Sequence, residues 1–305
     1  MKASIRPALP AAFRAAFLMM GAMLCFSAMA IAARELAGRH DTFEIMAARS
    51  AVGLALVLAW AIVAGRLREI SLAHFSAQLL RNGVHFVGQN LWFWALTLIP
   101  LSQLFALEFT APIWVILLAP LALGERLTAR RLVAAALGFA GILIVTRPFG
   151  IVPGPGVLAA AGSAVFFALT SILTKRLTVH ESLTAILFWL ALVQLVLGLA
   201  CALWDGALRW PDAQTLPWLV VIGLAGILAH LTLTAALRLA PASYVVPLDF
   251  VRLPLIALVG TAFYAEPLDP MVLAGGLVII LAVWINLRAE MAPAGIREES
   301  DPARR

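Results

Sequence analysis

The sequence predicts an all-α integral membrane protein with ten transmembrane helices arranged as a five-plus-five inverted repeat. Three observations predict this fold: the composition, the recurrence of long apolar runs, and the similarity of the two halves of the chain. Of the 305 residues, 63% are hydrophobic and only 12% are charged, whereas about a quarter of the residues of an ordinary globular chain are charged. A water-soluble fold is therefore excluded.

The charge and the cysteines exclude several function classes. The net charge of +6 arises from Arg and Lys in short segments between apolar runs, and no basic stripe interleaved with aromatic residues indicates a nucleic-acid partner. Cys25 and Cys201 lie far apart in apolar runs, so they provide neither a disulfide framework nor a zinc site. We expect no metal and no cofactor. The expected partners are the lipid bilayer and a small-molecule substrate, and a homodimer is one assembly that the sequence allows.

Ten apolar runs are each long enough to cross a hydrocarbon core of about 30 Å as a helix. Charged residues, or Pro and Gly, separate each run from the next. We predict helices over residues 12–33, 43–64, 78–98, 101–122, 129–146, 155–174, 184–203, 216–237, 241–263 and 269–287. The first run follows several basic residues, as in a signal peptide, but it is too long for one, so we expect a retained signal anchor.

The distribution of basic residues predicts the orientation, because Lys and Arg concentrate in cytoplasmic segments. With the N-terminus inside, fifteen Lys and Arg residues lie in cytoplasmic segments, and only Arg34, Arg39, Arg147 and Arg209 lie in outer loops. We therefore predict a multi-pass protein of the inner (plasma) membrane with both termini in the cytoplasm. Three further arginines lie inside predicted spans, namely Arg49, Arg81 and Arg252.

An internal repeat appears when the chain is aligned with itself at an offset of 141 residues. A proline start, an acid and a terminal Glu recur at one register: Pro100, Ser102, Leu107, Phe109, Leu117, Glu125 and Leu127 match Pro241, Ser243, Leu248, Phe250, Leu258, Glu266 and Leu268, and Glu108 pairs with Asp249. An odd number of spans in each half inverts the second half, and inverted repeats of this kind build alternating-access transporters.

These residues resemble the drug/metabolite transporter superfamily, EamA type. The resemblance rests on the Leu107–Pro112 stretch, on residues 236–250, and on Glu125 and Glu266. It implies two inverted halves around a central cavity, with repeats over residues 1–146 and 147–288 and a charged cytoplasmic tail over 289–305. Members of the family carry amino acids, nucleotide-like metabolites, vitamins or drugs. The run 247–254 is most similar to members that carry S-adenosylmethionine or riboflavin, and Arg49 matches an arginine familiar in the second helix.

Two acidic residues lie deep inside predicted spans, where an ionisable group costs about 2.5–3.5 kcal/mol unless a partner or a wet cavity receives it. Glu108 follows Pro100, and Asp249 follows Pro241, by eight residues, which places each about 12 Å inside its own entry face. The two carboxylates therefore approach the midplane from opposite sides. The alternative is that arginines merely neutralise them, as Arg252 does for Asp249 one helical turn away.

The run 78–98 carries polar residues at spacings of four, four and three, which puts them on one helix face. A polar and aromatic wall of this kind suits an amphipathic solute. The residues predicted to bind substrate are Gln89, Asn90, Trp92, Glu108, His230, Tyr244, Asp249 and Arg252, and those predicted to be structural or gating residues are Arg49, Arg81, His85, Pro112 and Pro254. The alternatives are an interfacial anchor for Arg81 and an interhelical hydrogen bond for His230.

Prolines and glycines have separate predicted roles in these helices. Pro112 and Pro254 interrupt the two runs that contain the acids, and paired interruptions of this kind point to a transport site, although a kink used only for packing is the alternative. Glycines in runs 129–146 and 269–287 are interpreted as close-packing positions: Gly138, Gly141, Gly275 and Gly276.

Together these features predict a secondary transporter that moves a small amphipathic metabolite, amino-acid-, nucleoside- or vitamin-like, by alternating access. One alternative is a membrane-embedded enzyme that processes lipid, which needs a nucleophile or a metal cluster at one interface. Another is a non-catalytic subunit of an envelope assembly. No phosphate loop, GxSxG or HExxH signature occurs, so no enzymatic activity is expected.

Overall fold

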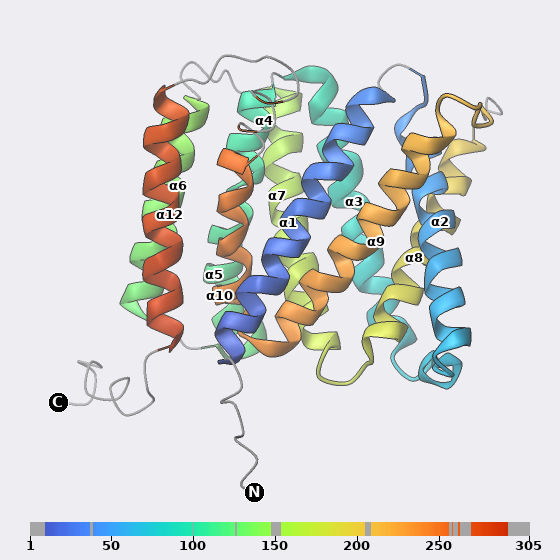
Figure 1. The fold of residues 1–305 in the computed structure, drawn as a ribbon, viewed down its shortest axis with the longest axis horizontal. Helices are drawn as coiled ribbons and strands as arrows, with labels where there is room; N and C mark the ends of the chain where they lie inside the picture. Colours follow the sequence, from blue (N-terminus) through green and yellow to red (C-terminus); the bar gives the residue numbers. More distant parts are fainter. Residues whose placement is uncertain are drawn as a thin grey trace, which may run out of the picture.

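The protein is a helical bundle in the computed structural model, which describes residues 10–36, 39–99, 101–125, 127–147, 154–204, 209–255, 258, 262 and 270–291. Figure 1 shows the helices running roughly along one direction. The long helices are α1 (Ala11–Glu35), α2 (Thr42–Val63), α3 (Phe75–Leu98), α6 (Ala129–Thr146), α7 (Pro155–Leu177), α8 (Leu183–Ala202), α9 (Leu216–Leu239) and α12 (Pro270–Met291). Within the described ranges there is no strand.

Two regions of the bundle are interrupted rather than continuous. In the first half, α4 (Leu101–Glu108) and α5 (Ala111–Leu123) follow one another with a break of two residues. In the second half, α10 (Ala242–Val245) passes into a tight 3₁₀ segment, η2 (Val246–Val251). Pro112 lies in the first turn of α5, and Pro247 lies inside η2, where each proline lacks the N–H that a regular helix would use. The prolines therefore account for the breaks beside Glu108 and Asp249.

Eight helical segments in the described part are long and apolar enough to cross a membrane. Two of the ten predicted runs are not among them. Run 78–98 corresponds to α3, whose polar stripe lowers its hydropathy, and part of run 241–263 lies outside the described residues. The all-helical membrane fold is nevertheless confirmed.

The pairing of helices follows an inverted repeat. An offset of 141 residues places α1 on α7, α2 on α8, α3 on α9 and α6 on α12. α1 packs along α9, and the repeat-related helices α7 and α3 pack along one another. The other two packed pairs, α2 with α8 and α6 with α12, each consist of a helix and its own repeat equivalent. This exchange of neighbours is what a pseudo-two-fold axis between the halves requires.

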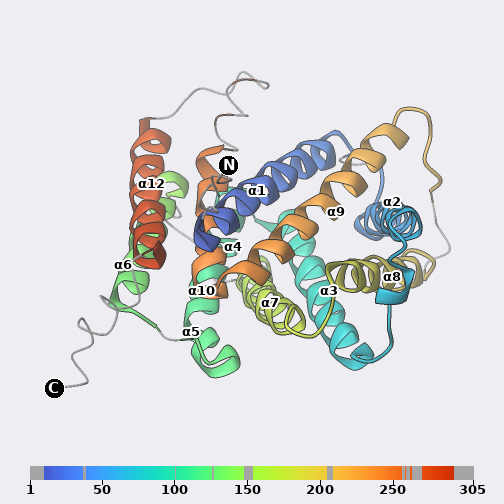
Figure 2. The same cartoon turned by 60° about the horizontal axis from the view of Figure 1, so that its bottom comes forward.

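The two self-related pairs lie at opposite ends of the long axis of the molecule, with α1, α3, α7 and α9 between them (Figures 1 and 2). The first turn of α1 and the last turn of α12 lie at the same end of the bundle. We call this the terminal end, and the other the distal end. Both chain ends of the described bundle thus fall on one side.

Local sequence signals define several helix ends. Asp41 accepts a hydrogen bond from the backbone N–H of Glu44, whose carboxylate accepts one from the N–H of Asp41, which is a capping box for α2. Thr128 and Ser182 cap α6 and α8 through their hydroxyl oxygens. Gly124 ends α5 at a positive φ of 65°, a conformation that favours glycine.

The predicted role of the helix glycines in close packing is confirmed. A Cβ at Gly141 would lie 2.8 Å from the carbonyl oxygen of Gly275, and a Cβ at Gly138 would overlap the ring of Phe250. The α6–α12 contact therefore depends on the absence of a side chain at Gly141, and the approach of η2 to α6 depends on its absence at Gly138. A Cβ at Gly223 of α9 would lie 3.1 Å from the carbonyl oxygen of Arg49, so α9 also approaches α2 closely beside an intramembrane arginine.

Candidate functional site

A cavity of about 760 Å³ lies between the two halves of the bundle. Its walls come from α1, α2, α3, α4 and α5 of the first half and from α7, α9 and η2 of the second. Pockets that enclose small organic ligands measure about 300–1,000 Å³ and are mainly apolar with a few placed polar groups. The cavity therefore has the size and position of a site for a small molecule.

One side of the cavity is built around Arg252, which follows η2. Its Nη2 donates to Glu108 Oε1 at 2.6 Å and to Asp249 Oδ2 at 2.9 Å. The second oxygen of Glu108 accepts a hydrogen bond from Trp92 Nε1 at 2.6 Å. One guanidinium thus joins the acids of the two repeats, and Asp249 has the arginine partner that the sequence left open as an alternative. We call Glu108, Asp249 and Arg252 the acid cluster.

Aromatic rings flank the acid cluster. The Arg252 Cζ lies 5.6 Å from the ring centre of Phe26 in α1 and 5.1 Å from that of Phe109, directly after α4. Both distances are within the range of cation–π attraction, about 6 Å. Phe109 is fully buried, whereas Trp92 and Phe26 are partly accessible. These rings form apolar faces next to two carboxylates.

The other side of the cavity is formed by the polar stripe of α3 and by Arg49 of α2. Arg81 is only 1% exposed; its Nε donates to Thr174 Oγ1 at 2.9 Å and its Nη1 to Asn82 Oδ1 at 2.7 Å. The buried position of Arg81 does not fit an interfacial anchor. Arg49 Nη1 lies 2.9 Å from the Gln89 side-chain amide, and it donates to the amide oxygen when the amide nitrogen is oriented toward Gln194. We call Arg49 and Arg81 the arginine pair.

Two buried histidines lie between the acid cluster and the arginine pair. The ring of His85 in α3 packs edge-on against that of His230 in α9, with their centres 5.1 Å apart. His230 in turn lies 5.7 Å from Phe26, which stacks near Arg252. His230 therefore makes ring contacts with His85 and Phe26, and its Nδ1 is buried without a hydrogen-bond partner among the described residues.

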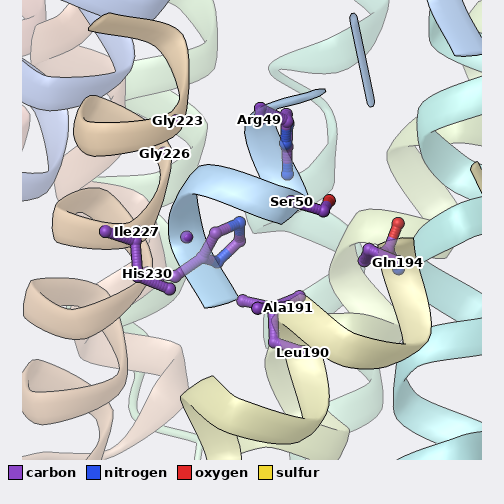
Figure 3. A pocket seen from close by; sticks show the side chains of 10 residues that line it. Arg49, Ser50, Leu190, Ala191, Gln194, Gly223, Gly226, Ile227 and His230 are labelled. Carbon is purple, nitrogen blue, oxygen red and sulfur yellow. The ribbon is translucent and has the colours of Figure 1, made fainter. Parts of the chain in front are cut away.

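A small side pocket of about 20 Å³ adjoins the cavity between α2, α8 and α9, enough for about one water molecule. Figure 3 shows Arg49, Ser50, Gln194 and His230 around this space. Gln194 Oε1 accepts from the Gln89 amide at 3.0 Å, and its Nε2 donates to the carbonyl of Asn82 at 2.9 Å. Gln194, which the sequence analysis did not single out, thus links α8 to the stripe of α3.

Three predicted residues do not line the cavity. Asn90 is one position along α3 from Gln89, so it points elsewhere, and its amide donates to the carbonyl of Phe86 at 2.7 Å. Tyr244 is fully buried near the terminal end, where its hydroxyl donates to the carbonyl of Ala12 at 3.0 Å. Pro254 packs against α12, 3.3 Å from the position of a Cβ at Gly276.

The other predicted residues line the cavity: Arg49, Arg81, His85, Gln89, Trp92, Glu108, Pro112, His230, Asp249 and Arg252. Two features of the cavity were not predicted from the sequence: its aromatic walls, Phe26, Phe105, Phe109 and Phe167, and the hydroxyl of Thr174, which orients Arg81. With 16 phenylalanines in the chain, composition offers no signal that separates wall positions from lipid-facing ones. Phe109 and Phe250 occupy equivalent positions in the two repeats, which singles them out in the sequence. Of the two, Phe109 lines the cavity and Phe250 does not.

Polar contacts close the bundle on the terminal side of the cavity. The carboxylate of Glu125 accepts from the backbone N–H groups of Ala242 and Ser243 at 2.7 and 3.0 Å, and it caps the short helix α10. Arg131 Nη1 donates to Ser243 Oγ at 2.9 Å, and Lys175 Nζ donates to the carbonyl of Ala240 at 2.8 Å. We call these contacts the terminal seal.

At the distal side, the lining continues to the ends of three helices. It includes Ile31 and Ala33 near the end of α1, His40 and Thr42 at the start of α2, and Thr97 at the end of α3. The lining therefore reaches the distal ends of these helices, whereas toward the terminal end it stops at Arg81 and Thr174 and does not include the residues of the terminal seal. This asymmetry is the one expected of one state of a two-sided access pathway.

The chain is similar in sequence to named transporters and in fold to a solved structure. The profile of the EamA-like transporter family matches residues 13–147 and 154–288. A riboflavin transporter of Brucella anthropi is 34% identical over 202 residues, which are 65% of this chain and 71% of that protein. An S-adenosylmethionine uptake transporter of Rickettsia felis is 25% identical over 276 residues, 90% of this chain and 92% of that one. A solved crystal structure superposes with a TM-score of 0.81 at 19% identity, covering 91% of this chain and 99% of that one.

Proposed function

The chain belongs to the EamA-like transporter family, and we propose that it carries a flat heteroaromatic metabolite of the vitamin or nucleoside class across the membrane by alternating access. The protein is a multi-pass membrane protein and a transporter of small molecules. The fifteen-to-four distribution of basic residues supports a plasma-membrane location with both termini in the cytoplasm. In that orientation the cavity extends toward the outside.

The observation that carries the proposal is that the acids of opposite repeats meet on one arginine at the wall of an aromatic-lined cavity. The bonds from Arg252 to Glu108 and Asp249 support a site that both halves share, and a shared site is what alternating access between two repeats uses. Phe26, Phe109 and Trp92 beside the acid cluster support a ring-bearing solute, because aromatic faces stack on flat heterocycles.

We assign binding roles to six residues of the cavity wall: Gln89, Trp92, Glu108, His230, Asp249 and Arg252. Trp92 offers a ring face, and the acid cluster offers acceptors for N–H and O–H groups of the solute. Asn90 and Tyr244, which bond to their own surroundings, are assigned supporting roles instead.

Names of relatives narrow the substrate class. Relatives named as riboflavin and S-adenosylmethionine transporters both carry, by those names, a heteroaromatic ring system joined to a polar chain. The cavity, about 760 Å³, can enclose a solute of this size. We infer that the protein acts without a cofactor and without catalytic chemistry, as a secondary carrier.

Transport by purified protein in liposomes tests the proposal. Labelled riboflavin, S-adenosylmethionine, a nucleoside and an aromatic amino acid would be offered separately to liposomes with and without the protein. We expect saturable uptake of a flavin or adenosyl compound, and strong loss of that uptake in Asp249→Asn. Asp212→Asn is the matched control, because Asp212 lies in the exposed turn before α9. Uptake limited to the amino acid, or to none of the four, would contradict the proposed class.

A further inference from the structure

The arginine pair has no acidic partner among the residues that the structure describes. In the described part of the chain, neither Arg49 nor Arg81 lies within ion-pair distance of a carboxylate; the arginine of the cavity that does is Arg252. Among the described residues of the lining, three arginines face two carboxylates, Glu108 and Asp249, so these residues carry one positive charge in excess. A buried charge without a compensating partner is strongly unfavourable.

Hydrogen-bonding capacity at this side of the cavity is also unfilled. Arg81 has five N–H groups, and its bonds to Thr174 and Asn82 use two of them. Within the described residues, both ring nitrogens of His85 and Nδ1 of His230 are buried without a hydrogen-bond partner. Buried polar groups are rarely left unpaired. An uncompensated positive charge and unfilled hydrogen-bonding atoms therefore coincide beside Arg49 and Arg81, whereas the unpaired Asp249 Oδ1 and Arg252 Nε of the acid cluster belong to groups that are already ion-paired.

We propose that Arg49 and Arg81, with His85 and His230 beside them, form a subsite for an oxyanion of the transported solute, a carboxylate or a phosphate monoester. The subsite rests on the proposed function, because it names the charged group of the solute that the cavity carries. Guanidinium groups match both oxyanions, since their planar N–H forks donate two parallel hydrogen bonds. The solute is then an anionic or zwitterionic metabolite rather than an uncharged one.

The two sides of the cavity also fix how the solute lies. The acid cluster carries one negative charge in excess, because Glu108 and Asp249 share the single guanidinium of Arg252. An oxyanion is repelled there and attracted to the arginine pair. The ring system is then left beside Phe26 and Trp92, and any cationic group of the solute lies toward Glu108 and Asp249.

A matched pair of ligands tests whether the subsite binds the oxyanion of a solute. Riboflavin and riboflavin 5′-phosphate share the ring system and differ by one phosphate, and quenching of tryptophan fluorescence reports binding of either to the purified protein. We expect the phosphate ester to bind about tenfold tighter or more, the size of a charge-assisted hydrogen bond. Arg49→Gln and Arg81→Gln should each reduce this preference to about twofold or less, whereas Arg66→Gln, in an exposed turn, should retain it.

A second measurement does not depend on the flavin class. Inorganic phosphate is compared with chloride at equal ionic strength for its effect on the thermal unfolding midpoint of the purified protein, because a ligand that binds the folded state alone raises the midpoint. We expect phosphate to raise it for the unmodified protein and for Arg66→Gln, and not for Arg49→Gln or Arg81→Gln. Where a Gln variant does not fold, the phosphate-induced shift of the unfolding midpoint is measured for Arg81→Lys and compared with that of the unmodified protein.

The combined outcomes separate the two proposals. An arginine-dependent phosphate shift without flavin or adenosyl binding supports the subsite and contradicts the proposed substrate class. Binding of riboflavin without a preference for its phosphate ester and without a phosphate shift overturns the subsite and leaves the transporter of uncharged flavin standing. A phosphate shift that both Gln variants retain also overturns the subsite, because the anion then binds elsewhere.

Discussion

Arg252 Nη2 lies 2.6 Å from Glu108 Oε1, although the two residues belong to opposite halves of the chain. The same nitrogen lies 2.9 Å from Asp249, the repeat partner of Glu108. The two halves are thereby joined at the cavity wall by charged groups that have little access to solvent. Any motion that opens the terminal end must either carry these three residues as a unit or break a bond between them.

Neutralising Arg252 should destabilise the protein strongly. Arg252→Gln leaves two carboxylates facing one another, and removing one partner of a buried ion pair costs about 3–5 kcal/mol. We expect a low yield of folded protein from membranes, measured by size-exclusion chromatography of a fluorescent fusion. Asp249→Asn leaves Arg252 paired with Glu108, so its yield should fall less than its transport rate.

A triple variant separates folding from transport. Glu108→Gln, Asp249→Asn and Arg252→Gln together remove all three charges, so yield should recover relative to Arg252→Gln alone. Transport should remain lost, because the acceptors for the solute have changed. Recovery of both yield and transport would mean that the cluster is only structural.

Opposite ends of the bundle should lie on opposite sides of the membrane. In a variant with Cys25 and Cys201 changed to Ser, a cysteine at Arg66 should react with a membrane-impermeant thiol reagent only from the cytoplasm. A cysteine at Asp212 should react only from outside. The basic residues of the loops give this direction, and labelling of intact cells against inverted vesicles checks it. The reverse pattern would place both termini outside.

The long helices were predictable because they depend on local hydropathy. Their inverted relationship was predictable because the sequence contains an internal repeat. The offset of 141 residues found in the sequence also relates α3 to α9 in the structure. The depth argument for Glu108 and Asp249 likewise needed only the rise of a helix. Both acids line one cavity in the structure.

Contacts between distant elements were not predictable in this way. Phe26 flanks Arg252 because α1 crosses beside η2, and Phe109 flanks it because the break after α4 lies there. No local pattern in α1 indicates its crossing. Tyr244 was assigned to the solute because of its depth and hydroxyl, but it lies beneath the terminal seal and bonds to Ala12. Sequence spacing gives the height of a side chain in the membrane, whereas its neighbours depend on how helices pack.

Removing the carboxylate of Glu125 should open the terminal end. Glu125→Ala deletes the acceptor for two backbone N–H groups at the start of α10, and a lost charge-assisted hydrogen bond is worth about 1.5–3 kcal/mol. We expect a cysteine at Thr174, in the cavity wall, to become reactive from the cytoplasmic side of inverted vesicles. Arg68→Ala, at an exposed position of the same side, is the control and should change nothing. Unchanged reactivity in Glu125→Ala would show that the seal is not a gate.

The solute should occupy the cavity between Gln89 and His230. Gln89 of α3 and His230 of α9 occupy equivalent positions in the two repeats and line the same cavity. In the cysteine-free background, cysteines placed at either position should react with a permeant maleimide and be protected by the transported compound at saturation. A cysteine at Arg66 should react at the same rate with and without the compound, since it lies in an exposed turn. Protection at both positions places the solute between the repeats, because the two helices come from different halves. If both cysteines react unprotected while transport of the compound proceeds, the solute passes by another route, and the assignment of Gln89 and His230 to the site is wrong.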